Sequence, residues 1–266
     1  MKILFWNTNR NNHINNYIIS LVKDYDVDIL IAAEYDSDEQ ELILGFEQSG
    51  LPLEPCNTLG CERLKIWSSY VKIDAGVQHK YYSIQIINDN CILCCTHLPS
   101  DLHGDSSEER FAIIQRIMMD INQLKEEIGT QEVVIVGDMN EMPYDKGCLN
   151  ANGFHGLPAV KLTERASRTV NGTEYAKYYN PMWNLMGDYS YPPGTYYWNA
   201  SRIKNPMWYM LDQVIISKEL IPKFKKEKLK ILTTCTYADL MNHNNIPDKH
   251  ISDHFPIICE IEDEKD

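Results

Sequence analysis

Eight polar side chains stand at the ends of apolar segments that have the composition of buried strands. They combine carboxylates, amides and imidazoles: Asn7, Glu34, His97, Asp138, Asn140, Asp212, Asp253 and His254. Catalytic and ligand-binding groups of α/β proteins gather where strands end, at one edge of a sheet. A single residue of this kind is commonly a turn former, a helix cap or a satisfied core group. Eight of them in the same relation to strands predict a shared site.

Cleavage of a phosphodiester is a reaction that this set could perform. It needs neutralised charge, an activated water and a protonated leaving group. Glu34 and Asp253 offer hard carboxylate oxygens that suit Mg²⁺ or Mn²⁺. The amides of Asn7 and Asn140 could orient a phosphate or a water without adding negative charge. Histidine transfers protons near neutral pH, and a buried carboxylate such as Asp212 could hold a histidine in one tautomer.

Alternating strands and helices are expected to position these residues. Buried strands are predicted at residues 2–6, 28–33, 81–87, 91–96, 131–136, 211–217 and 251–261. Apolar residues at helical spacing predict one helix around residues 14–25 and a longer helix over 106–128. The alternation indicates an α/β fold. Few Ser- or Gly-rich linkers interrupt it, so we expect residues 1–266 to form a single domain.

Local signals also predict how the helices begin and end. Asn11 or Asn12 could cap the first helix, and Ser106 with Glu109 fits a capping box at the start of the second. Gly129 stands where a C-terminal cap belongs.

The composition constrains partners and location. The net charge of −13 argues against a broadly basic surface, although a bound divalent metal could offset negative charge at a phosphate site. The eight cysteines are expected to be buried thiols, and strand alternation points Cys91 and Cys94 to opposite faces. No segment approaches the ~20 apolar residues of a membrane span, and the apolar run from Ile3 to Trp6 is too short for a signal peptide. We therefore expect a reducing, cytoplasmic location.

Six segments, taken in order, resemble the endonuclease/exonuclease/phosphatase superfamily and together span nearly the whole chain. They are ILFWNTN at 3–9, DILIAAE at 28–34, CCTHL at 94–98, VIVGDMN at 134–140, LDQVIIS at 211–217 and SDHFPI at 252–257. That superfamily includes pancreatic deoxyribonuclease, abasic-site endonucleases, sphingomyelinases, inositol-polyphosphate phosphatases and deadenylases. The resemblance implies an α/β four-layer sandwich, in which two packed mixed β-sheets are flanked by helices, with one cleft at the sheet ends. It also implies metal-dependent hydrolysis of phosphodiester bonds.

The resemblance assigns metal binding to three residues. Glu34 matches the principal metal ligand, Asp253 adds a second carboxylate, and Asn7 matches an asparagine close to both metal and phosphate. Asn9 stands where several relatives carry an aspartate that assists the metal, which leaves the number of metals open. We place Asn9 among the substrate-binding residues.

The remaining matches are catalytic. His254, supported by Asp212, would act as a base or contact the phosphate. Asp138, which pairs with Asn140 in the GDxN motif, is the competing candidate for activating water. His97 would stabilise the transition state or protonate the leaving oxygen. The abasic-site enzymes carry a different residue there, so His97 favours the deoxyribonuclease and sphingomyelinase relatives.

The substrate class stays open between two interpretations. A nuclease acting on DNA or RNA is our main interpretation, and the alternative is an enzyme for a small molecule or lipid headgroup of the inositol phosphate, sphingomyelin or cyclic nucleotide type. The intact set of polar residues disfavours a binding module without catalysis. Residues 191–209 are rich in Tyr and Trp, with Arg202 and Lys204 between them, which suits stacking on nucleobases or a pocket for a compact ligand.

Residues 178–209 are expected to form a wall of the cleft, because they lead directly into Leu211 and Asp212. Trp198, Asn199 and Trp208 are the candidates for substrate contact. The competing interpretation is that these aromatic side chains are simply buried core.

Overall fold

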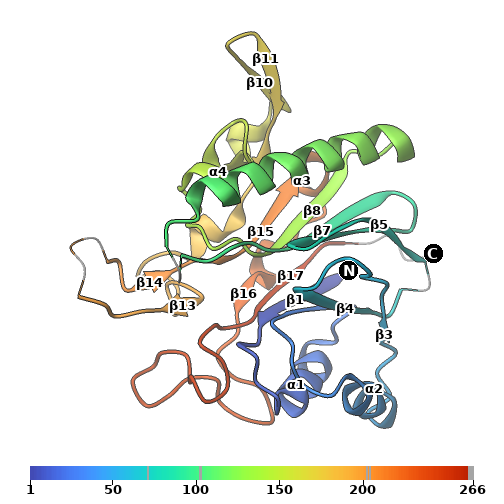
Figure 1. Cartoon of the computed structure of the whole chain (residues 1–266), viewed down its shortest axis with the longest axis vertical. Helices are drawn as coiled ribbons and strands as arrows, with labels where there is room; N and C mark the ends of the chain where they lie inside the picture. The colour runs from blue at the N-terminus through green and yellow to red at the C-terminus, as the bar shows by residue number, and fades with distance from the viewer. Residues whose placement is uncertain (71, 102–103, 202, 204, 263–266) are drawn as a thin grey trace.

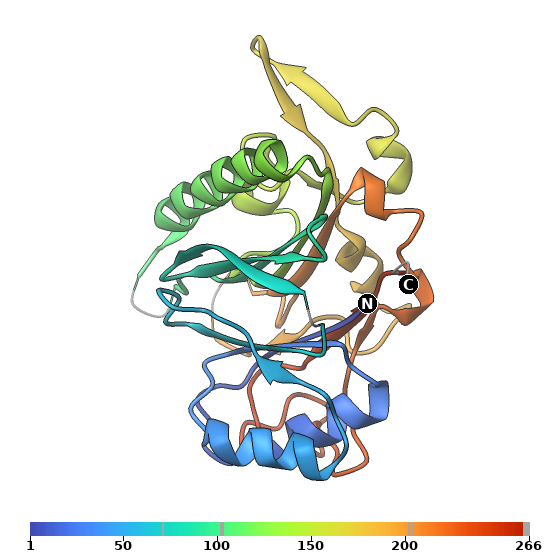
Figure 2. The same ribbon diagram turned by 90° about the vertical axis from the view of Figure 1, so that its right-hand side faces the viewer.

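Two large sheets lie face to face, and helices cover their outer faces (Figures 1 and 2). The computed structural model describes residues 1–266 except 71, 102–103, 202, 204 and 263–266. Arg202 and Lys204, which the sequence places between aromatic residues, lie outside the described residues.

The first large sheet has the strand order β16-β17-β1-β2-β4-β3. Its strands are β1 (Lys2–Asn7), β2 (Ile29–Ala33), β3 (Glu54–Pro55), β4 (Leu64–Ser68), β16 (Lys230–Ile231) and β17 (Ile257–Glu260). β1 runs parallel to β2 and antiparallel to β17, so the sheet is mixed.

The second large sheet has the strand order β5-β6-β7-β8-β15-β12-β9. Its strands are β5 (Ile73–His79), β6 (Tyr82–Ile87), β7 (Cys91–His97), β8 (Glu132–Asp138), β9 (Gly156–Leu157), β12 (Tyr178–Tyr179) and β15 (Asp212–Ser217). β7 and β8 are parallel, whereas β6–β7 and β8–β15 are antiparallel, so this sheet is also mixed.

The other elements are helices and two small hairpins. The helices are α1 (Asn15–Tyr25), α2 (Glu39–Gln48), α3 (Ser107–Ile128) and α4 (Lys146–Leu149), with 3-10 turns η1 (Val160–Thr163), η2 (Pro181–Leu185), η3 (Lys218–Leu220) and η4 (Lys226–Lys228). One hairpin, β10 (Ser167–Val170) and β11 (Thr173–Ala176), projects from the body, and the other consists of β13 (Tyr196–Tyr197) and β14 (Trp208–Tyr209) (Figure 1). Among the described helices, none combines the length and apolarity needed to cross a membrane.

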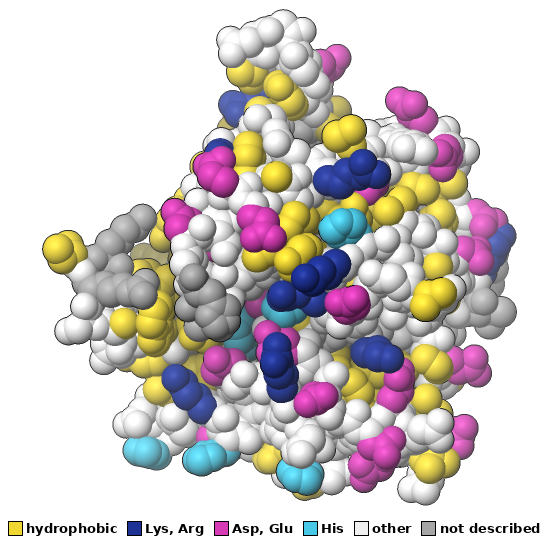
Figure 3. Space-filling model, in the orientation of Figure 1, with side chains coloured by type: hydrophobic (Ala, Val, Ile, Leu, Met, Phe, Trp, Pro, Cys, Tyr) yellow, Lys and Arg dark blue, Asp and Glu magenta, His cyan; other side chains and the backbone are white. Residues whose placement is uncertain are grey.

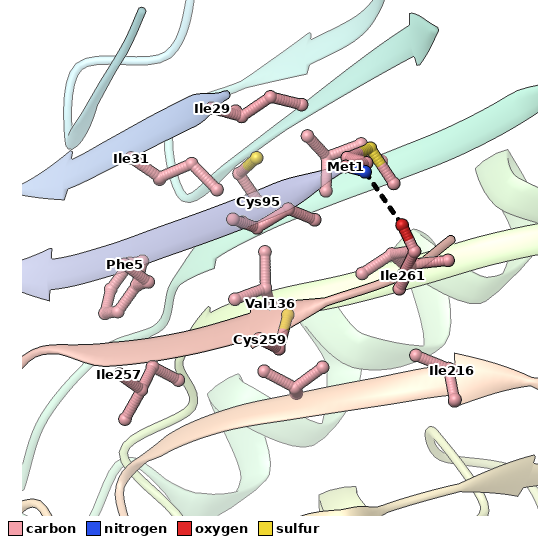
Figure 4. Packing of buried hydrophobic residues seen from close by; sticks show 14 of the residues in the cluster. Met1, Phe5, Ile29, Ile31, Cys95, Val136, Ile216, Ile257, Cys259 and Ile261 are labelled. Carbon is pink, nitrogen blue, oxygen red and sulfur yellow. Dashed lines mark hydrogen bonds between the residues drawn. The ribbon is translucent and has the colours of Figure 1, made fainter. Parts of the chain in front are cut away.

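Strand alternation divides the apolar residues into three layers of core. Ile3 and Phe5 of β1 face the second sheet, where they pack in the central cluster drawn in Figure 4. Leu4 and Trp6 face the opposite way and pack with Ile18 of α1. On the other side of the second sheet, its residues pack against α3. The predicted four-layer α/β sandwich is therefore confirmed.

The cysteines follow the same alternation. Six of the eight are buried, in line with their apolar surroundings. Cys91 and Cys95 belong to the central cluster, whereas Cys94 packs on the α3 side of β7. The prediction that Cys91 and Cys94 point to opposite faces is confirmed.

Two of the predicted helix caps are wrong. α1 begins after Ile14 without a side-chain cap, and the Asn11 side chain instead bonds the backbone of His13, His250 and Ile251. Ser106 is at the N-cap of α3 but makes no capping bond, because its hydroxyl donates to the Ser100 carbonyl at 3.0 Å. In both cases a bond to a neighbouring loop replaces the bond to the helix. The predicted cap at Gly129 is confirmed by its left-handed φ of 71°.

The last predicted strand is too long. The sequence predicts an extended segment over residues 251–261, but β17 covers only Ile257–Glu260. Pro256 has no N–H to give to a strand ladder, and the Phe255 N–H donates to the Thr195 carbonyl instead. The chain therefore reaches Asp253 and His254 as a loop.

Gly137 is the residue of the GDMN segment that the fold constrains most tightly. It has φ of +151°, and a Cβ there would lie 2.0 Å from the Thr96 carbonyl oxygen of the adjacent strand. We expect Gly137→Ala to destabilise the fold by more than the ~1–2 kcal/mol of a left-handed alanine alone, because β7 and β8 must also separate. Gly129→Ala, at φ of +71° with open space around it, is the matched control. Urea unfolding measures both, and equal losses would contradict the steric argument.

Candidate active site

Three catalytic candidates are brought side by side by strand register in the second sheet. His97 ends β7 and is the register partner of Asp138 at the end of β8. Asp138 is in turn the partner of Asp212 at the start of β15. All three are buried, so the sheet holds one imidazole and two carboxylates at the same edge.

The first sheet contributes Asn7 and Glu34 to the same edge. Asn7 is the last residue of β1, and Glu34 follows β2, whose last residue Ala33 is the register partner of Asn7. The Asn7 amide donates from Nδ2 to Asp138 Oδ2 at 3.0 Å. This buried bond joins the strand ends of the two sheets.

Glu34 is held in an uncommon backbone conformation, with φ of 51°. Its carbonyl accepts hydrogen bonds from the Thr8 hydroxyl and the Arg10 N–H. Its carboxylate oxygens lie 3.5 Å from Arg10 Nε and 3.5 Å from His97 Nε2. A left-handed non-glycine residue persists only where its surroundings hold it, and such residues cluster at functional sites.

His97 lies between two carboxylates in a buried position. Its Nε2 is 3.5 Å from Glu34 Oε1 and 3.8 Å from Asp138 Oδ2. Burial lowers the pKa of His97, although both carboxylates oppose this effect. The imidazole is therefore neutral near pH 7 and, with a proton on Nε2, can act as a hydrogen-bond donor.

Asp212 and His254 form a buried pair. His254 Nδ1 is 2.8 Å from Asp212 Oδ2, and the Asp212 side chain has no exposed surface. Burial alone would lower the pKa of His254, but the surrounding carboxylates, Asp212 first among them, outweigh it and raise the pKa to about 10. The pair uses Nδ1, which leaves Nε2 as the ring nitrogen for a substrate or water.

Ser252 fixes the loop that carries Asp253 and His254. Its buried hydroxyl donates to the Asn7 carbonyl at 2.7 Å and accepts the His254 N–H at 3.1 Å. Trp6 Nε1 donates to the His254 carbonyl at 2.9 Å. Both contacts attach this loop to β1, which explains its fixed position without strand structure.

One cavity of about 410 Å³ brings nine of the eleven predicted site residues together. Its lining includes Asn7, Asn9, Glu34, His97, Asp138, Asn140, Trp198, Asp253 and His254. Asp212 lies beneath it, in contact with His254. Asn199 is exposed and does not line it. Asn140 donates its amide to the Leu98 carbonyl at 2.9 Å, which leaves the side-chain oxygen for the cavity.

The aromatic segment divides between the cavity and the core. Trp198 is half-buried and lines the cavity. Trp208 instead stacks on Phe255, with ring centroids 6.3 Å apart, and packs with the cluster on the α1 side of the first sheet. Trp208 therefore follows the competing expectation of core packing.

Two residues of the cavity are not evident as site residues from the sequence. The Tyr196 ring lies 4.8 Å from that of His254, and burial, with the Asp253 and Asp138 carboxylates nearby, raises the pKa of Tyr196 to about 12. Its hydroxyl thus keeps its proton beside the site. Arg110, in the first turn of α3, is buried and pairs with Asp101 at 2.6 Å. The aromatic composition of 191–209 is the only sequence signal for Tyr196, and Arg110 has none.

The chemistry of the cavity fits a hard divalent cation. Glu34, Asp138 and Asp253 all line the cavity. Arg110 is the only Lys or Arg among the described residues of its wall, and Arg110 is already paired with Asp101. Carboxylate oxygens gathered in this way suit Mg²⁺ or Mn²⁺.

Among the described His, Cys, Asp and Glu residues, Asp138, Asp212 and His254 are the group whose possible ligand atoms all lie within 4.8 Å of one another. The hydrogen bond of 2.8 Å between Asp212 and His254 already uses one atom of each. Those two atoms are therefore engaged with each other and not free for a metal.

The sequence model of the endonuclease/exonuclease/phosphatase family matches residues 81–263, more than half of the chain. The chain belongs to this family. The resemblance inferred from the six segments is thereby confirmed, and no curated protein sequence matches the chain significantly.

Solved structures of family members share the fold at low sequence identity. NExo, a 3′ phosphatase from Neisseria bound to a product DNA hairpin, has a TM-score of 0.59 at 14% identity and covers 98% of this chain and 99% of its own. An AP endonuclease from Archaeoglobus fulgidus has a TM-score of 0.58 at 13% identity and covers 99% of this chain and 100% of its own. TDP2 from D. rerio, complexed with a single-strand DNA product, has a TM-score of 0.57 at 14% identity and covers 99% of each chain. Identities this low establish a common fold alone, so they do not test whether His97 favours the deoxyribonuclease and sphingomyelinase relatives.

Ser252 provides a test of how the loop at 251–256 is held. We expect Ser252→Ala to lower the free energy of unfolding by about 1–3 kcal/mol, because two buried backbone groups lose their partner. Ser20→Ala is the control, because the Ser20 hydroxyl also makes two hydrogen bonds, to Asp24 at 3.3 Å and from the Tyr237 N–H at 3.0 Å, but both are exposed to solvent. It should change stability by less than about 0.5 kcal/mol. Urea denaturation compares the two, and a Ser252→Ala variant as stable as the control would show that other contacts hold the loop.

Proposed function

We propose that this protein is a divalent-metal-dependent phosphodiesterase that cleaves DNA or RNA. The observation that carries the proposal is the convergence of strand ends from both sheets on one acidic cavity, beside the Asp212–His254 pair. Membership of the endonuclease/exonuclease/phosphatase family supports the reaction class.

Glu34, Asp253 and Asn7 would hold Mg²⁺ or Mn²⁺ in this proposal. A bound cation neutralises charge on the scissile phosphate and on the leaving oxygen. Asn140 and Asn7 both line the cavity, and neither adds negative charge near the phosphate. Asn9, at the exposed edge of the cavity, contacts the substrate beyond the phosphate.

Proton transfer is divided between the two histidines. His254 takes a proton from the attacking water through Nε2 or contacts the phosphate, while Asp212 holds Nδ1. The pKa of His254 falls towards neutrality when a cation offsets the nearby carboxylates. His97, neutral and between two carboxylates, donates towards the leaving oxygen. Asp138 is the alternative base, since it lies against the same cavity.

Two observations support a nucleic acid as the substrate. Tyr196 and Trp198 give the cavity an aromatic wall, on which bases can stack. NExo and the D. rerio TDP2 were solved with DNA products, which agrees with this choice. The second candidate is a phosphorylated small molecule or lipid headgroup, which the compact cavity of about 410 Å³ also suits.

Two further proposals complete this assignment. We propose that residues 1–266 form a single domain, supported by the central cluster that both large sheets share. We also propose a cytoplasmic location, supported by Cys94 and Cys95, which are free and fully buried thiols.

A substrate panel tests the proposed function. We expect hydrolysis of single-stranded DNA or RNA with Mg²⁺ or Mn²⁺, and none in excess EDTA, because the acidic cavity needs a cation to accept a phosphate. Double-stranded DNA, cyclic dinucleotides, inositol phosphates and sphingomyelin complete the panel. Preferred turnover of an inositol phosphate or of sphingomyelin would favour the second candidate, and full activity in EDTA would exclude metal dependence.

The Asp212–His254 pair can be tested by a double-mutant cycle. His254→Ala should reduce turnover by about 10²–10⁴-fold. Asp212→Asn should also impair turnover, because the imidazole loses its orienting partner. Combining the two should cost little more than His254→Ala alone. Losses that multiply in the double variant would show that Asp212 acts independently of His254.

Trp198 and Trp208 differ in a way that separates substrate contact from packing. We expect Trp198→Ala to raise KM for the nucleic-acid substrate with little change in melting temperature, because its side chain lines the cavity. Trp208→Ala should cost up to about 3 kcal/mol of stability, because its ring stacks on Phe255. Steady-state kinetics and thermal unfolding measure the two effects. An unchanged KM together with a large loss of stability in Trp198→Ala would remove Trp198 from the site.

A further inference from the structure

A second pocket adjoins the catalytic cavity. It has a volume of about 390 Å³ and is lined by residues 10, 34–36, 62–65, 80 and 97. Glu34 and His97 line both pockets, so they stand in the wall between them. The two pockets therefore adjoin each other at Glu34 and His97.

The two pockets differ in the charged side chains that line them. The catalytic cavity is acidic and aromatic, and Arg110 is the one Lys or Arg on its described wall. Four cations line the second pocket: Arg10, Arg63, Lys65 and Lys80. Figure 3 shows Lys and Arg side chains near the middle of this face, beside His and acidic side chains. Three carboxylates, Glu34, Asp36 and Glu62, also line this pocket, so its cations outnumber its acids on a chain whose net charge is −13.

Arg63 and Lys80 are the cations of this pocket that remain available to a ligand. Arg10 lies 3.5 Å from Glu34, and Lys65 lies 2.8 Å from Glu39. Within the described part of the chain, neither Arg63 nor Lys80 has a carboxylate at ion-pair distance. The two acids that share the pocket with them, Asp36 and Glu62, are exposed to solvent.

A shared aromatic ring holds these two cations next to the catalytic residues. The Arg63 guanidinium lies 4.7 Å from the centroid of the Tyr81 ring, and Lys80 Nζ lies 5.2 Å from it. The Arg63 carbonyl accepts the Glu34 N–H at 3.4 Å, and the Tyr81 carbonyl accepts the His97 N–H at 2.9 Å. The backbone thus fixes both ends of this cluster to the two residues of the shared wall.

We propose that the Arg63–Lys80 pocket binds a second phosphate of the substrate, next to the phosphate that is cleaved. This inference rests on the proposed phosphodiesterase function and narrows its substrate class. The scissile phosphate occupies the acidic cavity, a flat group contacts Tyr196 and Trp198, and the chain continues past Glu34 and His97 to the cationic pocket. A substrate with one phosphate leaves this pocket empty, and a cationic headgroup of the choline type is repelled from it.

A comparison of two substrates tests the pocket. Bis(4-nitrophenyl) phosphate carries one phosphate, and trithymidylate carries a neighbouring one. In the Arg63→Ala, Lys80→Ala double variant, we expect kcat/KM for trithymidylate to fall about tenfold more than for the simple ester, mostly through KM. Replacing Arg63 with lysine instead of alanine, together with Lys80→Ala, should restore part of the lost kcat/KM, because lysine keeps the positive charge. Lys72→Ala, on the same hairpin but paired with Asp89, should leave the ratio of the two substrates unchanged.

A binding measurement without metal gives a readout that does not depend on turnover. Fluorescence anisotropy of labelled oligothymidylate in EDTA should show weaker binding by the double variant. The slope of log affinity against log salt should be shallower by about 0.7 for each phosphate that the variant no longer neutralises. Melting temperatures of all variants confirm folding, and Arg63→Gln with Lys80→Gln replaces the alanine pair if stability falls.

The outcomes separate the inference from the function on which it rests. Equal losses of kcat/KM on both substrates, with an unchanged salt dependence of binding, would show that the pocket does not bind a second phosphate. A selective loss on an inositol bisphosphate, with trithymidylate unaffected, would support a second-phosphate pocket that serves a small molecule. Absence of metal-dependent turnover in the wild type would overturn the proposed function, and the salt dependence of binding would then decide the pocket by itself.

Discussion

Asn7 donates its side-chain amide to Asp138 over 3.0 Å, and this contact joins the last residue of β1 to the last residue of β8. The two strands belong to different sheets, whose facing sides are held together mainly by apolar contacts without direction. A buried hydrogen bond has a direction and a length, so it fixes how far the sheets can slide at this edge. The separation between Glu34 on one sheet and His97 on the other depends on that alignment.

The two histidines of the site show how environment separates similar groups. His97 is buried at a strand end, and burial outweighs its two carboxylate neighbours, so its pKa is lowered. His254 is buried as well, but the short contact with Asp212 reverses the balance and its pKa is raised. Near pH 7 the same side chain is thus neutral on one side of the cavity and protonated on the other, where a bound cation would offset the carboxylates and free His254 to accept a proton.

The sequence is sufficient to predict the strand ends but not the contacts made by loops. Apolar runs predict where β1, β2, β7, β8 and β15 lie, since burial dominates them, and a polar residue at one end of each run marks the site. The predicted caps and the predicted start of β17 fail because Ser106 and Phe255 bond to other segments of the chain. Arg63 and Lys80 cannot be recognised as a pair for the same reason, since only the ring of Tyr81 between them brings them together. Trp198 and Trp208 are alike in the sequence, and tertiary packing alone distinguishes them.

The pairing of β17 with β1 joins residues near opposite ends of the chain, in a register that matches Lys2 with Glu260. During synthesis, β1 is made before β17 and cannot form this pairing until residues 257–260 have been added. Asp253 and His254 immediately precede that partner. An incomplete chain, even one that has folded its second sheet, therefore lacks both a proposed metal ligand and the histidine of the buried pair. Under the proposed function, hydrolysis of nucleic acid therefore requires β1, β17 and the loop at 251–256 to be assembled together.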